Sequence, residues 1–347
     1  MGATATLASM LNSLSAINTP SATGCEALAA FCKASADELR LNILRVLRHN
    51  AFSVQELCHI FDLKQSAMSH HLKVLAAAQW VTTRREGNSI FYRRFELGHG
   101  EPFASLQQAL LQCIDHCELD ETIARRVQEV EQHRTELSQA FFVENAGRFR
   151  EQQELMADFE LYANGVANML DAIPLPAHQL AVEIGPGEGL FLPELAHRFV
   201  QVSAFDTSAE ILQQALELTE KENLANVHLY QGDTRAAAQM TNVDCVVINM
   251  VLHHVANPAD LFRDTAMCLK PGGALLVTDL CHHDQEWART ACGDVWLGFE
   301  PNDLERWAAQ AGLIHGHSSF LAQRNGFKVQ IQHFLKPNPS VNPLSQP

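Results

Sequence analysis

The stretch Val182-Glu183-Ile184-Gly185-Pro186-Gly187-Glu188-Gly189 decides the fold of the C-terminal half of this chain. Its first three residues end the apolar run 180–184, which predicts a β-strand. Its glycines follow that strand and precede a segment with helical periodicity. A glycine turn at the end of a strand lets a ligand approach the backbone closely. The spacing is G-x-G-x-G, and Leu190 stands where a dinucleotide-binding motif requires glycine or alanine. The sequence therefore disfavours NAD and FAD as ligands.

Strands and helices alternate on both sides of this turn. Strands are predicted at 180–184, 202–205, 227–230, 245–248 and 274–278, with helices between them that include 209–221 and 258–269. Such alternation predicts an α/β Rossmann-like domain with a mostly parallel sheet. Two further β-like runs flank Asn325-Gly326 and predict a hairpin at the sheet edge, which gives seven strands in total.

Acidic residues stand at the ends of three successive predicted strands. Asp206 ends the second strand, where its carboxylate would accept both ribose hydroxyls of a nucleoside. Asp233 follows the third strand, where it would accept the adenine amino group. Glu183 adds negative charge beside the glycine turn and favours an ammonium or sulfonium group over a phosphate. Together these carboxylates indicate an adenosyl ligand without a phosphate.

Residues 155–335 resemble the class I S-adenosylmethionine-dependent methyltransferases. Further matching motifs are Asn249-Met250-Val251-Leu252-His253-His254 after the fourth strand and Leu269-Lys270-Pro271-Gly272-Gly273 before the fifth. The resemblance implies S-adenosyl-L-methionine or S-adenosyl-L-homocysteine as cofactor. It also implies that six residues line the cofactor site: Gly185, Gly187, Gly189, Asp206, Asp233 and Asn249. We add Glu183 to the cofactor-binding residues because of its charge beside the glycine turn.

The sequence leaves methyl transfer itself open. Transfer from a sulfonium is an in-line displacement in which alignment does much of the work, and a general base helps when the acceptor is a hydroxyl or thiol. Candidate bases are His253, His254 and His283 at the ligand-bearing edge, although polar filling of a loop explains them equally well. The Asn/Asp-Pro-Pro-Tyr tetrad and the Pro-Cys nucleophile of DNA methyltransferases are absent, which argues against DNA methylation.

The N-terminal part reads as four helices followed by a hairpin. Ser53 and Glu56 predict a capping box that opens a short helix, and a second helix carries Met68 and Leu72 on one stripe. This is the layout of a helix-turn-helix, whose second helix enters the major groove. The candidate DNA contacts are Gln65, Ser66, Ser69, His70, His71 and Lys73 on that helix, with Arg84, Arg85 and Arg93 of the hairpin for phosphates.

The distribution of charge supports that interpretation. The chain carries a net charge of −15, yet residues 1–100 hold ten basic and seven acidic side chains. Residues 64–94 contain six basic side chains and one acidic side chain. A basic segment on an acidic chain is where a polyanion would dock.

Residues 31–94 resemble the winged helix-turn-helix of the ArsR family of bacterial regulators. The matching text is residues 36–44, Ser69-His70-His71-Leu72-Lys73-Val74-Leu75, and Arg85-Glu86-Gly87-Asn88 with Tyr92. The resemblance implies a homodimer that binds a palindromic operator in double-stranded DNA and usually represses. Metal-sensing members carry two cysteines one residue apart, whereas Cys58 stands alone here, so we assign no metal ligands.

Residues 101–154 are predicted to form a helical dimerisation or linker region. Ile123, Val127, Val130, Leu137 and Phe141 make a heptad stripe that Arg134 interrupts. An intersubunit seam and a helix packed on its own domain explain the stripe equally well. The predicted organisation is thus mixed: a disordered tail at 1–22, an α+β winged-helix domain at 23–100, helices at 101–154, the methyltransferase-like domain at 155–335 and a disordered tail at 336–347.

Residues 279–299 resemble bacterial ArsR-type regulators fused to a methyltransferase-like domain, among them S-adenosylhomocysteine-responsive regulators of methionine-cycle genes. The resemblance implies a homodimeric repressor whose second domain senses S-adenosylmethionine or S-adenosylhomocysteine. Two alternatives stay open: an active methyltransferase on a small molecule, and a metal-responsive repressor that depends on Cys58. Nine irregularly spaced cysteines predict reduced thiols, and no apolar run approaches the roughly 18 residues of a membrane helix. We therefore expect a cytoplasmic bacterial protein without a membrane partner.

Overall fold

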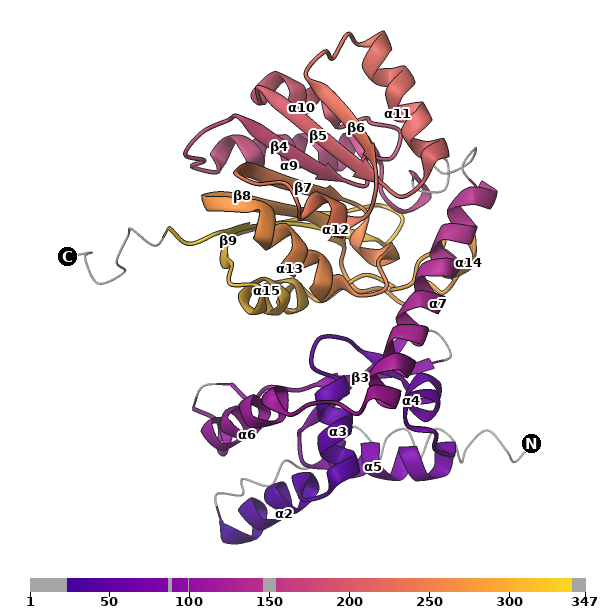
Figure 1. The fold of residues 1–347 in the computed structure, drawn as a ribbon, viewed down its shortest axis with the longest axis vertical. Coiled ribbons are helices and arrows are strands. Elements are labelled where there is room, and N and C mark those ends of the chain that lie inside the picture. The colour runs from indigo at the N-terminus through magenta and orange to yellow at the C-terminus, as the bar shows by residue number, and fades with distance from the viewer. Residues whose placement is uncertain (1–23, 87–88, 99, 146–153, 339–347) are drawn as a thin grey trace, which may run out of the picture.

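A computed structural model of the chain describes residues 24–86, 89–98, 100–145 and 154–338. A smaller N-terminal domain lies below a larger α/β domain, and one long helix runs from the first along the side of the second (Figure 1). The predicted tail at 1–22 and most of the predicted tail at 336–347 lie outside the described residues. Among the described residues, no helix has both the length and the apolar character needed to cross a bilayer.

The N-terminal domain is a winged helix-turn-helix. Its elements are α2 (Cys25–Ser35), α3 (Glu38–Val46), β1 (Phe52–Ser53), α4 (Val54–Phe61), α5 (Gln65–Ala77), β2 (Val81–Glu86) and β3 (Ser89–Arg94). The three strands form one antiparallel sheet in the order β1-β3-β2. Ser53 and Glu56 make the predicted capping box at the start of α4, which is confirmed. Met68 and Leu72 of α5 are fully buried in the core of this domain, as the stripe predicted.

Two helices follow the wing, α6 (Ala104–His116) and α7 (Glu121–Asn145). Leu111 of α6 and Val130 of α7 pack into the core of the winged-helix domain, so α6 and the first half of α7 belong to that domain rather than to a separate linker. Leu137, one of the five predicted stripe residues, has 59% of its surface exposed. Arg134, which interrupts the stripe, is instead buried, with 7% of its surface exposed.

The C-terminal domain is a seven-stranded α/β fold, as predicted. Its strands are β4 (Leu180–Ile184), β5 (Gln201–Asp206), β6 (Val227–Gln231), β7 (Val243–Asn249), β8 (Leu269–Leu280), β9 (Ile314–Ala322) and β10 (Lys328–Leu335). The sheet order is β6-β5-β4-β7-β8-β10-β9, in which the first five strands are parallel and β10 runs antiparallel to both neighbours. The hairpin at 325–326 therefore closes the sheet edge, as expected.

Helices cover both faces of this sheet. One core contains side chains of α9 (Phe159–Ala172), α10 (Leu192–Arg198) and α11 (Ala209–Lys221). The other contains side chains of α12 (Thr234–Ala237), α13 (Pro258–Cys268) and α15 (Pro301–Gln310). Two short helices complete the fold, η2 (Leu252–His254) and α14 (Trp287–Ala291). Alternate residues of each strand face opposite cores, as the pleat requires: Val246 packs on one side and Val247 on the other.

The sheet holds one residue of the predicted C-terminal tail. The Lys336 backbone N–H donates to Gly273 O at 2.9 Å, and its ammonium donates to Ala266 O at 2.8 Å and Leu269 O at 2.6 Å. Lys336 is therefore part of the folded domain, because its ammonium supplies donors for carbonyls where α13 meets β8.

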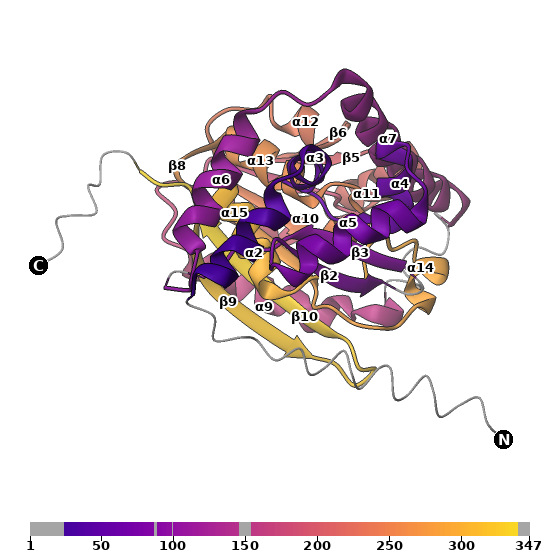
Figure 2. The ribbon, with the colours of Figure 1, turned by 90° about the horizontal axis from the view of Figure 1, so that it is seen from below.

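The wing packs against the C-terminal domain. Phe91 of β3 belongs to the second hydrophobic core of that domain and meets Trp296 edge-on, with ring centroids 5.4 Å apart. Helix α5 lies on the opposite side, at the bottom of Figure 1 and toward the viewer in Figure 2. The two domains therefore share an apolar contact, while α5 is turned away from it.

Candidate functional site

A cavity of about 300 Å³ opens where the parallel strands of the C-terminal domain end. Its walls include the ends of β4, β5 and β7 and the segment after β6. The chain reverses its strand order between β4 and β7, and open α/β sheets bind ligands at such a point. Six of the seven predicted cofactor residues line this cavity: Glu183, Gly185, Gly187, Asp206, Asp233 and Asn249.

The glycine turn lets the backbone form one wall of the cavity. Gly185 has φ +64°, and a Cβ there would lie 2.5 Å from Val251 Cγ2. Gly187 has φ +57°. Gly189, at φ +82°, is absent from the cavity lining among the described residues, and its Cβ would lie 3.3 Å from the Cα and Cβ of Ala215. Gly189 therefore does not line the cavity in the described chain, and its lack of a Cβ lets α11 pack closely.

Glu183 is the most unusual carboxylate in the cavity. It is 1% exposed, and Asn249 Nδ2 donates to its Oε1 at 3.4 Å. Its Oε2 has no hydrogen-bond partner within the described part of the chain. Burial raises the pKa of Glu183 to about 8, against the smaller opposing effect of Asn249. A cationic ligand group beside this carboxylate would supply the missing partner.

Asp206 and Asp233 lie at the ends of the neighbouring strands. Asp206 Oδ1 accepts from Ser208 N at 2.9 Å, and burial raises the pKa of this carboxyl to about 6. Asp233 Oδ1 caps α12 by accepting from Arg235 N and Ala236 N. Backbone donors thus fix the orientation of both carboxylates, which is the preorganisation that a hydroxyl- or amine-bearing ligand needs.

Helix α7 supplies a wall of the cavity that sequence reasoning missed. Four of its polar side chains line the cavity: Glu131, Thr135, Ser138 and Gln139. Glu131 Oε1 accepts from Asn50 Nδ2 of the winged-helix domain at 2.6 Å and from Asn257 Nδ2 of the C-terminal domain at 3.3 Å. One carboxylate thus joins the two domains at the edge of the ligand cavity.

Arg134, one turn further along α7, joins the same elements. Its guanidinium makes a two-point hydrogen bond to Glu56, at 2.8 and 2.7 Å, and also donates to Ala51 O and Ala256 O. It lies 4.9 Å from the ring centroid of Trp296. Burial raises the pKa of Glu56, but the hydrogen bonds and charge of Arg134 outweigh it and hold that pKa below its ordinary value. The same Glu56 closes the capping box of α4, the first helix of the DNA-binding motif.

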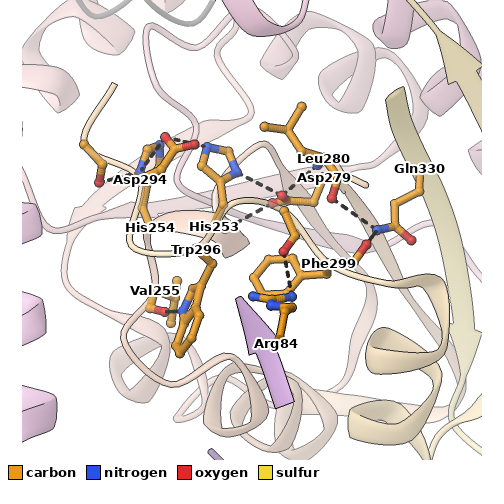
Figure 3. A network of polar contacts seen from close by, with 12 residues as sticks. Arg84, His253, His254, Val255, Asp279, Leu280, Asp294, Trp296, Phe299 and Gln330 are labelled. Atoms are coloured by element: carbon orange, nitrogen blue, oxygen red, sulfur yellow. Dashed lines mark hydrogen bonds and ion pairs between the residues drawn. The ribbon is translucent and has the colours of Figure 1, made fainter. Parts of the chain in front are cut away.

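The three candidate bases have different surroundings. His254 lines the cavity, whereas His253 is fully buried and His283 stands against the ring of Phe327, with centroids 4.7 Å apart. Figure 3 shows His253 between Asp279 and Asp294. Burial lowers the pKa of His253, but the charges of the two aspartates outweigh burial and raise it to about 9. Burial and the charge of His253 hold the pKa of His254 well below its ordinary value.

The predicted DNA contacts on α5 are mostly open to solvent. Gln65, Ser66, His70 and Lys73 are exposed, and Ser69 is partly exposed. His71 is partly buried, with its Nδ1 3.8 Å from Asp37 Oδ1. The solvent-exposed face of α5 therefore carries polar side chains of the kind expected of a groove-reading helix, and the helix itself lies on the side of its domain away from the C-terminal domain (Figure 2).

The wing arginines divide between two faces. Arg84 donates to Gly298 O at 3.1 Å, and Arg93 forms an ion pair with Asp303 of α15, so both contact the C-terminal domain instead of the open face expected for phosphate contacts. Arg85 is exposed. Adjacent residues in a strand point to opposite faces, which is why Arg84 and Arg85 differ. Burial lowers the pKa of Arg93 to about 10.

The cavity residues fit an adenosyl ligand with a cationic amino-acid tail. Glu183 offers an unpartnered buried oxygen among the described residues, and Gly185 lets the backbone turn closely against Val251 in the cavity wall. Asp206 adds a carboxylate acceptor, which ligand hydroxyls would need, to the cavity lining. Within the described lining the charged groups near the glycine turn are acidic, and a pyrophosphate would meet Glu183 and Glu188 there.

Comparison with known proteins agrees with both domains. A family model described as "Methyltransferase domain" matches residues 151–330, more than half of the chain, and one described as "Bacterial regulatory protein, arsR family" matches residues 37–82.

Curated relatives match over part of their length. "Ubiquinone biosynthesis O-methyltransferase" of Xanthomonas axonopodis pv. citri is 27% identical over 152 residues, covering 40% of this chain and 64% of the relative. An "Uncharacterized 37.1 kDa protein in transposon TN4556" of Streptomyces fradiae is 34% identical over 113 residues, covering 31% of this chain and 32% of the relative. The chain thus spans less than two thirds of the length of these relatives.

Solved structures match part of the chain. A Haloferax volcanii complex of the Trm112 methyltransferase activator and a methyltransferase matches with a TM-score of 0.47 and 16% identity, over 57% of this chain and 98% of the other. A geranyl diphosphate C-methyltransferase of Streptomyces coelicolor A3(2) matches with a TM-score of 0.44 and 13% identity, over 51% of this chain and 80% of the other. From the family matches and the fold together, the chain belongs to the methyltransferase domain family and carries an arsR-family helix-turn-helix on its N-terminal side.

Proposed function

We propose that this protein is a homodimeric, DNA-binding transcriptional repressor of the bacterial cytoplasm whose methyltransferase-fold domain binds S-adenosylmethionine or S-adenosylhomocysteine as an effector. Methionine-cycle genes are the proposed targets, because those two ligands report the state of that cycle. On the DNA side, the proposed contacts are the residues of α5 together with Arg85, while Arg84 and Arg93 are reassigned to the contact between the domains.

The single observation that carries this proposal is that α7 belongs to both sites. Its Glu131 and Ser138 line the ligand cavity, and its Arg134 holds the carboxylate of Glu56 that caps the first helix of the DNA-binding motif. A ligand that moves α7 therefore also moves α4, the helix that precedes α5 in the DNA-binding motif. This is a contiguous set of contacts between two sites, as coupling by packing and hydrogen bonds requires.

We assign each of three cavity carboxylates to one part of the ligand. Glu183 would hold a cationic group, Asp206 the ribose hydroxyls and Asp233 the adenine amino group. When bound, S-adenosylmethionine supplies a transferable methyl group on a sulfonium. The demethylated form differs by that methyl and one positive charge, so a cavity lined by acidic residues distinguishes the two. Only a difference in affinity between two protein states shifts their populations, which makes this discrimination the basis of a response.

A DNA mobility-shift assay titrated separately with the two cofactor forms tests the proposal. We expect one form to change operator affinity by about 5- to 150-fold, the usual range of allosteric coupling. Asp206→Ala should remove both ligand binding in calorimetry and the effect on DNA, while DNA binding without ligand stays. Equal DNA affinity with either form at saturating concentration would refute the effector role.

An active methyltransferase is the second candidate. The observation that favours it is that His254 lines the cavity with a neutral imidazole able to accept a proton from an acceptor hydroxyl. Relatives named as O-methyltransferases point the same way. Incubation with methyl-labelled cofactor and a cell extract separates the two candidates: sustained turnover of a small acceptor, lost in His254→Asn, would favour the enzyme.

A further inference from the structure

Three buried ligand groups converge beside the cofactor cavity, and we call His253, His254 and Asp294 the buried triad. One nitrogen from each histidine and one oxygen of Asp294 all lie within 4.8 Å of one another. Asp294 Oδ1 is 3.9 Å from His253 Nε2 and 4.0 Å from His254 Nδ1. Ligand atoms around a tetrahedral zinc ion with bonds of about 2.1 Å lie about 3.4 Å apart, so small inward shifts would bring them to bonding distance.

His253 has the environment of a metal-binding histidine. Its Nδ1 is 2.9 Å from Asp279 Oδ1, and the two side chains are both fully buried. Its other ring nitrogen, Nε2, has no hydrogen-bond partner among the described residues and faces Asp294 (Figure 3). A carboxylate on one imidazole nitrogen, which fixes the ring and leaves the other nitrogen for the ion, is typical of the surroundings of metal-bound histidines.

The charges in this region favour a divalent cation. Asp279 and Asp294 are two carboxylates without exposed side-chain surface, and both lie within 4 Å of a ring nitrogen of His253. Asp279 also accepts from Leu280 N at 2.7 Å, which fixes its position behind His253. A divalent ion between the two imidazoles and Asp294 would be attracted by both carboxylates. The nearby guanidinium of Arg84 is directed to Gly298 O and Asp303 instead.

We propose that the buried triad is a binding site for one borderline divalent cation of the zinc or ferrous class, with Asp279 orienting His253 behind it. Two imidazoles and one carboxylate, with a further position open to water or ligand, suit these ions rather than calcium or magnesium. The long contact from His254 Nδ1 to Gly293 O, at 3.3 Å, is the one that the ion would replace.

The position of the triad gives the ion a structural consequence. Val295 N and Trp296 N both donate to His253 O at 3.0 Å, and the indole of Trp296 meets Phe91 of the wing. His254 lines the cofactor cavity. The ion would therefore fix the short segment that separates the cavity from the wing.

Cobalt(II) titration of the chelator-treated full-length protein tests this site. We expect one tight equivalent with visible d–d bands of nitrogen and oxygen coordination and without thiolate charge transfer, displaced by zinc(II). Asp294→Asn should weaken binding more than about 100-fold, and Asp279→Asn about 10- to 100-fold. The matched control His283→Gln alters a nearby histidine outside the buried triad and should bind as the wild type does.

Thermal unfolding followed by circular dichroism shows whether each variant is folded, so that lost metal binding is not mistaken for lost structure. Zinc(II) should raise the Tm of the wild type and of His283→Gln but not that of Asp294→Asn. Calorimetry with S-adenosylhomocysteine reads the cofactor cavity separately, so a failed effector proposal and a failed metal proposal are told apart. Equal cobalt affinity in the wild type and Asp294→Asn, or spectra dominated by thiolate charge transfer, would overturn the proposal and leave a protonated His253 between two aspartates.

Discussion

Glu183 is a buried carboxyl whose protonation should report ligand binding. With a pKa raised to about 8 by burial, it is mostly protonated at about pH 7 in the free protein. A cationic ligand group favours the ionised form, so we predict that binding of S-adenosylhomocysteine releases close to one proton at that pH. Calorimetry in buffers of different ionisation enthalpy measures this release. Glu183→Gln should abolish it, and a buffer-independent enthalpy in the wild type would contradict the assignment.

The same group makes the stability of the ligand-free protein depend on pH. Because the folded-state pKa of Glu183 lies above its unfolded value, its contribution to folding is fully present below about pH 4. That contribution is lost as the pH rises through about 8. The free energy of unfolding should therefore fall between about pH 5 and 9 more steeply in the wild type than in Glu183→Gln, as urea titrations would show. Equal slopes in the two proteins would mean that Glu183 titrates normally.

Gly185 permits both a left-handed turn and a close approach to Val251. Gly185→Ala adds strain at φ +64° and a contact of 2.5 Å, and we expect a loss of about 2–5 kcal/mol in stability with loss of ligand binding. Gly312→Ala is the matched control, since it has φ +78° but nothing within 4 Å of its Cβ in the described chain. It should cost about 1–2 kcal/mol from strain alone and leave ligand affinity unchanged. Equal stability losses in the two variants would show that the contact with Val251 is harmless.

For single residues, the sequence identified which side chains belong to the cavity better than it predicted the face of a strand on which a side chain lies. Glu183 and Asp206 were found because strand ends of a parallel sheet converge on one edge. Arg84 and Arg93 were assigned to phosphates from their charge and their place on the predicted hairpin. The register of the wing pairs Arg84 with Phe91 and Thr82 with Arg93, which puts both arginines on the face of the apolar Phe91. Period-two alternation along the wing was the available signal.

At the scale of elements, α7 connects the two sites through Arg134. Arg134→Met removes a buried two-point ion pair with Glu56, so we expect a loss of about 2–4 kcal/mol in unfolding free energy. We also predict that the ratio of DNA affinities with and without effector falls toward one, as measured by mobility shift. Arg125→Met on the same helix is the control, since the Arg125 side chain is 60% exposed and its ion pair is a local one with Glu129, four residues along α7. A variant at Arg134 that keeps the full effector response would rule out α7 as the connection.

The role of α7 was beyond sequence reasoning. Its periodicity predicted a helix and an apolar stripe, and the first half of that stripe packs on the winged-helix domain. The polar residues that line the cavity, such as Thr135 and Gln139, occupy the face that periodicity assigns to solvent. That face becomes a wall only because a second domain folds against it.

At the scale of the whole molecule, one face of the wing packs against its own chain and the other carries the exposed Arg85, which we propose for DNA. We predict that Arg85→Ala lowers operator affinity and reduces the slope of log K against log salt by about 0.9, the value for one phosphate contact. Arg93→Ala should leave that slope unchanged while weakening the effector response, because its partner is Asp303. Mobility shifts at several salt concentrations measure both. Equal changes in slope for the two variants would mean that Arg93 also reaches phosphate.

Phe91 places part of the wing inside the apolar interior of the other domain, and this limits how the two halves can be exchanged. A winged-helix domain expressed alone would expose the Phe91 ring and leave the guanidinium of Arg93 without the carboxylate of Asp303. Replacing the C-terminal domain with that of another protein would do the same unless the replacement also had an apolar pocket for Phe91 and an aspartate for Arg93. The two halves of this protein are therefore matched at this contact, and a chimera should keep the wing together with residues 294–303 of its own C-terminal domain.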